Sequence, residues 1–145
     1  MLVDTNRFGP VECHPEDLLT FPQGLIGMEN CQKWVLLADS ENTALGWLQS
    51  VERRDLALAV VSPRRFVPDY QLRISARDLE GVGYSKASEL QVLVILSRME
   101  DSLAVNLKAP VVFCLQSRQG RQVVAKDDHE VQYVLGATVP FRRSA

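Results

Sequence analysis

Histidine and cysteine are scarce in this chain of 145 residues. The histidines are His14 and His129, and the cysteines are Cys13, Cys31 and Cys114. Because an odd number of widely spaced cysteines gives neither a disulfide framework nor a zinc-ligand pattern, we expect reduced thiols that pack as small apolar side chains. The phosphate-binding patterns G-x-x-x-x-G-K-[ST] and G-x-G-x-x-G are also absent from the sequence.

The remaining candidates for catalysis are weak. Cys13 and His14 are adjacent, and adjacent residues of a strand point to opposite faces, so they are not predicted to form a nucleophile–base pair. The run KDDHE at residues 126–130 has metal-ligand side chains, but such a run more commonly forms a polar turn, and no second cluster completes a site. We therefore predict a protein that is not an enzyme, without catalytic residues, metal or cofactor.

An excess of basic residues is missing as well. The chain has 16 lysines and arginines against 18 acidic residues, a formal net charge of −2. Nucleic-acid binding normally depends on a basic excess that neutralises phosphates, so we expect protein partners and no direct nucleic-acid contact. A small β-barrel that binds RNA is the alternative. The pairs Arg53-Arg54, Arg64-Arg65 and Arg142-Arg143 are interpreted as solvated loop charge.

Long apolar runs are lacking too. The uncharged stretch from Leu18 to Met28 is far shorter than the roughly 20 residues that a membrane span needs. Charged residues near the N-terminus leave no room for the apolar core of a secretory signal; they are Asp4, Arg7, Glu12, Glu16 and Asp17. We expect a cytoplasmic protein without membrane association.

The sequence does contain many short apolar segments bounded by charge, proline or glycine, which is typical of strands. We predict strands at residues 33–39, 45–51, 56–62, 70–75, 90–97, 103–107, 110–116 and 121–125, and others near 2–8, 16–21 and 131–135. Residues 39–44 and 117–120 suit tight hairpin turns. This pattern predicts an all-β fold: an antiparallel, barrel-like domain that spans residues 1–145 as a single domain, with one or two short helices.

One short helix is predicted at residues 76–81, because Ser75 is placed to cap it and Asp78 follows three residues later. The stretch VSPRRFVPDYQL at residues 61–72 is interpreted as a stiff connector. Pro63 ends the preceding strand, and Pro68 fixes the backbone before a strand that would start at Tyr70. Such a connector could turn Phe66 inward as a plug.

Several motifs are specific in combination. They are FPQGLIGME (21–29), GWLQSVE (46–52), LALAVVSPRRFVPDYQLRIS (56–75), VLVILS (92–97), VNLKAPVVF (105–113) and RQGRQVV (118–124). In this order and at these spacings, the chain resembles the FliW family of flagellar assembly factors across nearly its whole length. Two departures concern partner specificity: Arg53-Arg54 stand where the family usually has acidic residues and a proline, and the ending GATVPFRRSA does not match.

The resemblance implies a binding switch on a barrel-like fold without known catalysis or cofactor. The protein would hold newly made flagellin in the cytoplasm. Once flagellin is exported, the freed protein, expected to be a monomer, would bind the translational regulator CsrA away from its RNA surface. It would thereby antagonise CsrA allosterically and release translation of flagellin mRNA.

Six residues at polar or aromatic motif positions are the candidate protein-binding residues: Gln49, Ser50, Phe66, Asp69, Tyr70 and Asn106. Each has a structural alternative. Asp69 and Asn106 would cap turns through side-chain to backbone hydrogen bonds, and Phe66 would fill the barrel end. Trp34 and Trp47 lie in predicted strands and are expected in the core.

Overall fold

A computed structural model describes residues 1–135 of the chain. Its strands are β1 (Leu2–Thr5), β2 (Gly9–Glu12), β3 (Leu18–Thr20), β4 (Lys33–Ala38), β5 (Gly46–Ser50), β6 (Ala57–Val61), β7 (Leu90–Met99), β8 (Ser102–Val105), β9 (Val111–Cys114), β10 (Gln119–Gln122) and β11 (Tyr133–Val134). Four 3-10 helices complete it: η1 (Pro15–Asp17), η2 (Pro63–Arg65), η3 (Ala76–Leu79) and η4 (Ala87–Glu89). None of these described helices is long and apolar enough to cross a membrane.

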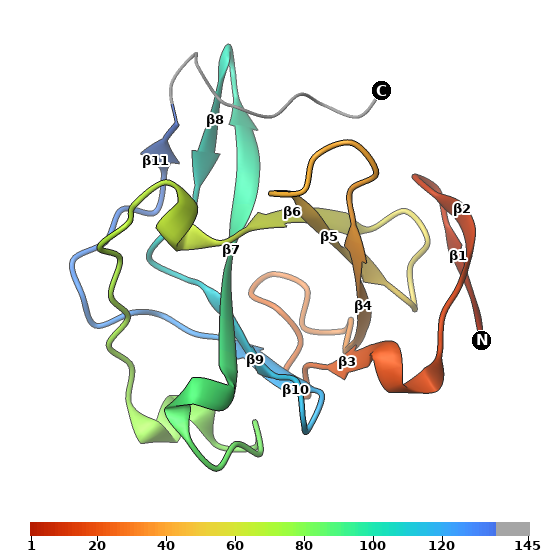
Figure 1. The fold of residues 1–145 in the computed structure, drawn as a ribbon, viewed down its shortest axis with the longest axis horizontal. Helices are drawn as coiled ribbons and strands as arrows, with labels where there is room; N and C mark the ends of the chain where they lie inside the picture. The colour runs from red at the N-terminus through yellow and green to blue at the C-terminus, as the bar shows by residue number, and fades with distance from the viewer. Residues whose placement is uncertain (136–145) are drawn as a thin grey trace.

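Seven of the strands close into a barrel, which Figure 1 shows as a ring. The order around the ring is β7-β6-β5-β4-β3-β10-β9, and a further pairing of β9 with β7 closes it. The pairings are antiparallel, with the exception of β3 and β10, which meet in parallel at Thr20 and Gln119. The predicted all-β, antiparallel barrel-like fold is therefore confirmed, with one parallel contact that the sequence did not indicate.

The long strand β7 connects the barrel to a projecting sheet. Its first part, from Leu90 to Leu93, pairs with β9, and Val94 and Ile95 pair with β6. Its last part, from Leu96 to Met99, pairs with β8, which in turn pairs with β11. Strands β8 and β11 therefore extend beyond the ring, at the top of Figure 1.

The barrel interior holds one apolar core. Alternate residues of the ring strands point inward, so Leu19, Trp34, Leu48, Val60 and Val111 meet there although they come from five strands. Phe21, Leu25, Cys31 and Phe113 complete this cluster. Trp34 is fully buried and donates its indole N–H to the Cys31 carbonyl at 3.0 Å, so the core position predicted for Trp34 is confirmed.

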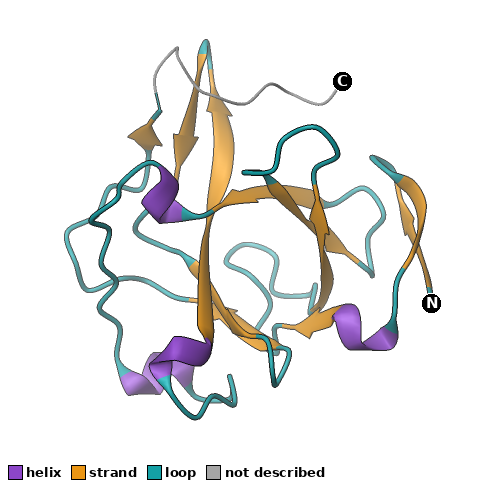
Figure 2. Cartoon of the chain, in the orientation of Figure 1, coloured by secondary structure: helices purple, strands orange, loops and turns teal. Residues whose placement is uncertain are grey.

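The outer faces of the barrel are covered by chain segments that lie outside the ring. The β1–β2 hairpin packs Val3 and Cys13 against Val35 of β4. A second cluster, around Trp47, Val61, Val94 and Val105, lies beneath residues 66–72, which contribute Tyr70 to it. Figure 2 shows that this covering segment consists of loops and turns rather than strands. Trp47 is buried there, as the sequence predicted.

The bounds of most predicted strands are confirmed within a residue or two. The hairpin turn predicted at residues 39–44 is confirmed as well, since it joins β4 to β5. The early strand predicted near 2–8 is instead a hairpin of β1 and β2. Thr5 Oγ1 makes this turn by donating to the Gly9 carbonyl and accepting from the Phe8 N–H, each at 2.8 Å. The strand predicted at 121–125 begins earlier, at Gln119, because the preceding turn lies at 115–118.

The strand predicted at residues 70–75 is wrong. Tyr70, Leu72 and Ile74 alternate like strand residues because they pack onto the outer-face clusters, but the segment pairs with no strand among residues 1–135. The helix predicted at 76–81 is the 3-10 helix η3, and its predicted cap is confirmed: Ser75 Oγ accepts from the Asp78 N–H at 3.2 Å. Residues 136–145, with Arg142-Arg143, lie outside the described residues.

Candidate protein-binding surface

Gln49 is fully buried on β5, with its side chain directed at the loop that follows the strand. Its Nε2 donates to the carbonyl oxygens of Ser50, Arg53 and Arg54 at 2.9, 3.3 and 3.4 Å. With the amide nitrogen facing three acceptors, its Oε1 must face the other way, where it is buried and accepts no hydrogen bond within residues 1–135. The side chain therefore shapes the loop at residues 51–56.

Ser50 holds the same loop from the barrel side. It is fully buried, and its Oγ accepts from the main-chain N–H groups of Glu52 and Arg53 at 3.2 and 2.9 Å. Glu52 Oε1 accepts in turn from the N–H groups of Gln32 and Lys33 at 2.6 and 2.8 Å, which ties the loop to the start of β4. The motif W-L-Q-S thus builds a defined loop rather than an exposed polar strand.

Asn106 and Tyr70 both bond to the turn that follows β8. Asn106 Oδ1 caps the turn after β8 by accepting from the N–H groups of Lys108 and Ala109 at 3.1 and 3.0 Å. Tyr70 is almost completely buried and donates its hydroxyl to the Leu107 carbonyl at 2.8 Å. Burial, and secondarily the charge of Asp127, raises the pKa of Tyr70 to about 12.

His129 closes over Tyr70. The two rings stack with centroids 4.5 Å apart, and His129 Nε2 lies 2.7 Å from the Gln71 carbonyl. Asp127 accepts from the Arg73 N–H at 2.5 Å and from Arg73 Nε at 3.0 Å. The run at residues 126–130, which the sequence analysis interpreted as a polar turn, therefore clamps the covering segment at residues 70–73.

Phe66 and Asp69 are the outermost of the six candidates. Phe66 is half-buried and packs on the outer-face cluster around Trp47, not in the barrel end. Asp69 is exposed, and its side chain makes no hydrogen bond or ion pair within residues 1–135, so the expected turn-capping role is wrong for it. The structure therefore brings Phe66, Asp69, Tyr70 and Asn106 to one region and places Gln49 and Ser50 in another.

The cysteines are free and buried, as expected for thiols that pack as small apolar side chains. Cys13 is buried whereas His14 is exposed, which separates the two groups. Burial, followed by the charge of Asp17, raises the pKa of the Cys13 thiol and disfavours the reactive thiolate. Within residues 1–135 no group of three or more histidine, cysteine or acidic side chains is placed to hold a metal ion.

Of the hollows that residues 1–135 form on the surface, two lie beside β5, and the sequence did not indicate either. One, of about 480 Å³, opens at the barrel end beside the β4–β5 turn, where Leu36 is 40% exposed next to Val60 and Leu93. The other, of about 370 Å³, is polar; its lining residues are Asn6, Arg7, Gln49, Arg54, Asp55 and Ala57. Alternation along β5 predicts that Trp47 and Gln49 lie on one face of the strand. Arg7 belongs to the β1–β2 turn, and no local sequence pattern predicts that this turn lies beside β5.

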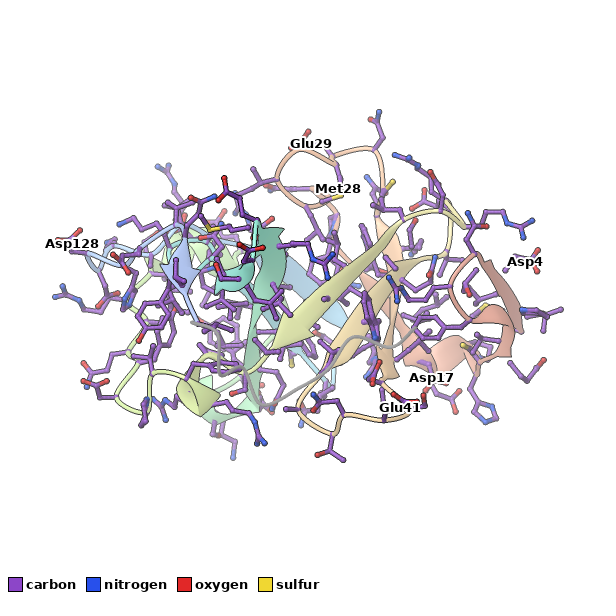
Figure 3. The ribbon with its side chains drawn as sticks, turned by 90° about the horizontal axis from the view of Figure 1, so that it is seen from above. Asp4, Asp17, Met28, Glu29, Glu41 and Asp128 are labelled. Atoms are coloured by element: carbon purple, nitrogen blue, oxygen red, sulfur yellow. The ribbon has the colours of Figure 1, made fainter. Side chains whose placement is uncertain are left out.

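Several acidic side chains project from the surface. In Figure 3, Asp4, Asp17, Glu41 and Asp128 project outward from different parts of the ribbon, and all four are exposed. The described residues thus form a small closed β-barrel, covered on its outer faces, whose polar motif residues support loops. This arrangement places the protein in the class of small closed β-barrels.

The chain belongs to the FliW family: the family model described as "FliW protein" matches residues 2–135. It is 36% identical over 131 residues to the flagellar assembly factor FliW of Bdellovibrio bacteriovorus, covering 89% of this chain and 75% of that protein. It is 34% identical to the flagellar assembly factor FliW of Natranaerobius thermophilus, covering 86% and 84%. A crystal structure of the flagellar assembly factor FliW superposes with a TM-score of 0.86 at 28% identity, covering 94% and 97%.

Proposed function

We propose that this protein is a cytoplasmic flagellar assembly factor that acts by binding other proteins and not by catalysis. The match of the family model over residues 2–135 carries the proposal, since the relatives reported above are named flagellar assembly factors. The superposition with a FliW crystal structure over 94% of this chain supports it further. The whole chain of 145 residues would act as one domain.

Its partners would be flagellin and the translational regulator CsrA, bound in alternation. While flagellin is held, CsrA would remain free to repress translation of flagellin mRNA; after export, the freed protein would bind CsrA and antagonise it allosterically. A rigid barrel suits this role, because two ligands that compete for overlapping surface need no conformational change. The net charge of −2 suits a basic regulator better than it suits RNA.

Among the six candidate residues, the exposed Asp69 and the half-buried Phe66 would contact a partner directly. Gln49, Ser50, Tyr70 and Asn106 would act by fixing the neighbouring loops, because their polar atoms bond within the fold. A charge reversal, Asp69→Lys, should therefore weaken binding of one partner without loss of stability. Asp101→Lys is the matched control, since Asp101 is also exposed but lies in the β7–β8 turn.

The test is titration calorimetry of the purified protein against CsrA from the same organism, repeated with flagellin already bound. We expect a stoichiometric complex with CsrA that disappears when flagellin is present. Absence of heat with both partners, in a folded protein, would contradict the proposal. Salt-sensitive RNA binding by the isolated protein would favour the alternative of an RNA-binding barrel instead.

A further inference from the structure

The polar hollow between the β1–β2 turn and the loop after β5 contains two arginines, Arg7 and Arg54, that the fold holds in place. We propose that this hollow binds the carboxylate of an acidic peptide segment on a protein partner. The inference goes beyond the proposed function, because it concerns the chemistry of one contact and does not depend on flagellin or CsrA.

Arg54 is fixed by the neighbouring turn. Its Nε donates to Asn6 Oδ1 at 2.8 Å, while the Asn6 N–H donates to the Arg54 carbonyl at 2.9 Å. This pair of bonds joins the loop at residues 51–56 to the β1–β2 turn. The terminal amino groups of the Arg54 guanidinium make no hydrogen bond or ion pair with any residue from 1 to 135, so they are available to a ligand.

Arg7 is held by stacking. Its guanidinium carbon lies 4.0 Å from the ring centroid of Trp47. The indole is itself fixed, because it donates its N–H to Asp39 Oδ1 at 3.0 Å and meets the edge of Phe8 at 6.1 Å between centroids. A guanidinium stacked on an aromatic face keeps its N–H donors directed outward in its own plane. Within residues 1–135 the Arg7 side chain forms no ion pair.

The acidic side chains nearby do not neutralise these two cations. Asp55 belongs to the lining of the hollow, but Arg53 donates to both of its oxygens, at 3.3 and 3.0 Å. These hydrogen bonds hold the pKa of the Asp55 carboxyl below its usual range. Glu52 is bonded to the main chain at the start of β4. Within residues 1–135 the hollow therefore presents two guanidinium groups that form no ion pair.

A carboxylate fits this arrangement better than a nucleic-acid backbone. A guanidinium binds a carboxylate with two parallel hydrogen bonds, and preorganised donors lose little side-chain freedom on binding. A polyphosphate would extend beyond a hollow of about 370 Å³, and the chain as a whole carries a net charge of −2. Gln49 also belongs to the lining of the hollow, where it fixes the loop that carries Arg54 by donating to the Arg54 carbonyl at 3.4 Å.

The test is an NMR titration of the 15N-labelled protein with N-acetyl-Glu-Glu-amide, with N-acetyl-Gln-Gln-amide as the neutral match and inorganic phosphate as the third probe. We expect saturable shifts of the Arg7 and Arg54 Nε–H and Trp47 indole N–H resonances with the acidic peptide alone. Arg54→Gln should raise the dissociation constant at least fivefold. Asp55→Asn should lower it, because it removes an anion and releases Arg53.

Arg98→Gln is the matched control, since it makes the same charge change on an exposed arginine of β7. It should leave the dissociation constant within twofold of the unsubstituted protein. Equal shifts with the neutral peptide, an unchanged affinity in Arg54→Gln, or phosphate binding as tight as the acidic peptide would each overturn the proposal. If Arg54→Gln unfolds, the direction of the Asp55→Asn effect decides the question. None of these readouts requires flagellin or CsrA.

Discussion

Several polar residues of the sequence motifs form hydrogen bonds within the fold that hold loops in place. Ser50 and Asn106 each accept two main-chain N–H bonds at the start of a loop, and Gln49 donates to three carbonyl oxygens. The sequence indicated these positions, because polar side chains are unusual in or beside strands that are otherwise apolar. It could not assign their acceptors, since these lie in loops whose paths depend on tertiary contacts.

The raised pKa of Tyr70 predicts how the stability of the protein depends on alkaline pH. Its phenol pKa is about 12 in the folded protein, against about 10 for an exposed tyrosine. Between these two values the unfolded chain ionises first, so the stability that the neutral phenol contributes is intact below pH 10 and is lost as the pH rises to 12. We expect the free energy of unfolding to fall by about 2 kcal/mol over this interval. Urea denaturation at several alkaline pH values measures it.

The variant Tyr70→Phe separates this effect from general alkaline unfolding. It removes the titrating group and the hydrogen bond to the Leu107 carbonyl, so it should cost about 1 kcal/mol at neutral pH. Its free energy of unfolding should then decline less between pH 10 and 12. An identical decline in both proteins would show that the pKa of Tyr70 is not raised in the folded protein.

At the scale of elements, strand prediction succeeded where an apolar segment has a ladder partner. It failed at residues 70–75, where apolar alternation arises from packing on the outside of the barrel. Alternation reports which face of an extended chain is buried, not whether its main chain pairs. The bonds of this segment go instead to the loop at residues 126–130, including the Lys126 N–H to the Arg73 carbonyl at 2.8 Å.

Asp127 is the centre of that clamp. Burial raises its carboxyl pKa, but the hydrogen bonds from Arg73 outweigh this, and the pKa lies below its usual range. The clamp is therefore intact above the pKa of about 3.9 of an unfolded aspartate and is lost as the pH falls through the lower folded value.

In Asp127→Asn, amide hydrogen exchange of the segment at residues 70–75 should be faster at neutral pH. The protection of this segment should also change less when the pH is lowered. Asp128→Asn, an exposed neighbour, is the control and should exchange as the unsubstituted protein does.

At the scale of the whole molecule, the barrel depends on contacts between distant parts of the chain. Strand β3 pairs with β10 about a hundred residues later, and β9 pairs with both β10 and β7. The all-β class followed from local patterns, but the parallel contact between Thr20 and Gln119 did not, because no local signal specifies which strands meet at the closure of a barrel.

Gly120 tests how tightly this closure is packed. A Cβ added there would lie 2.6 Å from Phe21 Cε2 and 2.8 Å from both Phe113 Cβ and the Val112 carbonyl oxygen. We expect Gly120→Ala to lower the free energy of unfolding by about 1–3 kcal/mol, since overpacking displaces ring and main-chain atoms. Gly46→Ala is the matched strand control, because its methyl would meet only side-chain ends at 3.3 and 3.4 Å, and the main chain at 3.6 Å. Equal losses in chemical denaturation would contradict this account.

The pairing of β3 with β10 has a consequence for the protein's own synthesis. The ring cannot close until the residues up to Gln122 have left the ribosome, because β10 supplies the strand between β3 and β9. Until then the β3 edge and the apolar interior have no cover, and a nascent chain is open to proteases and chaperones. A messenger broken before the codon of Gln122 therefore yields a chain that cannot close its barrel.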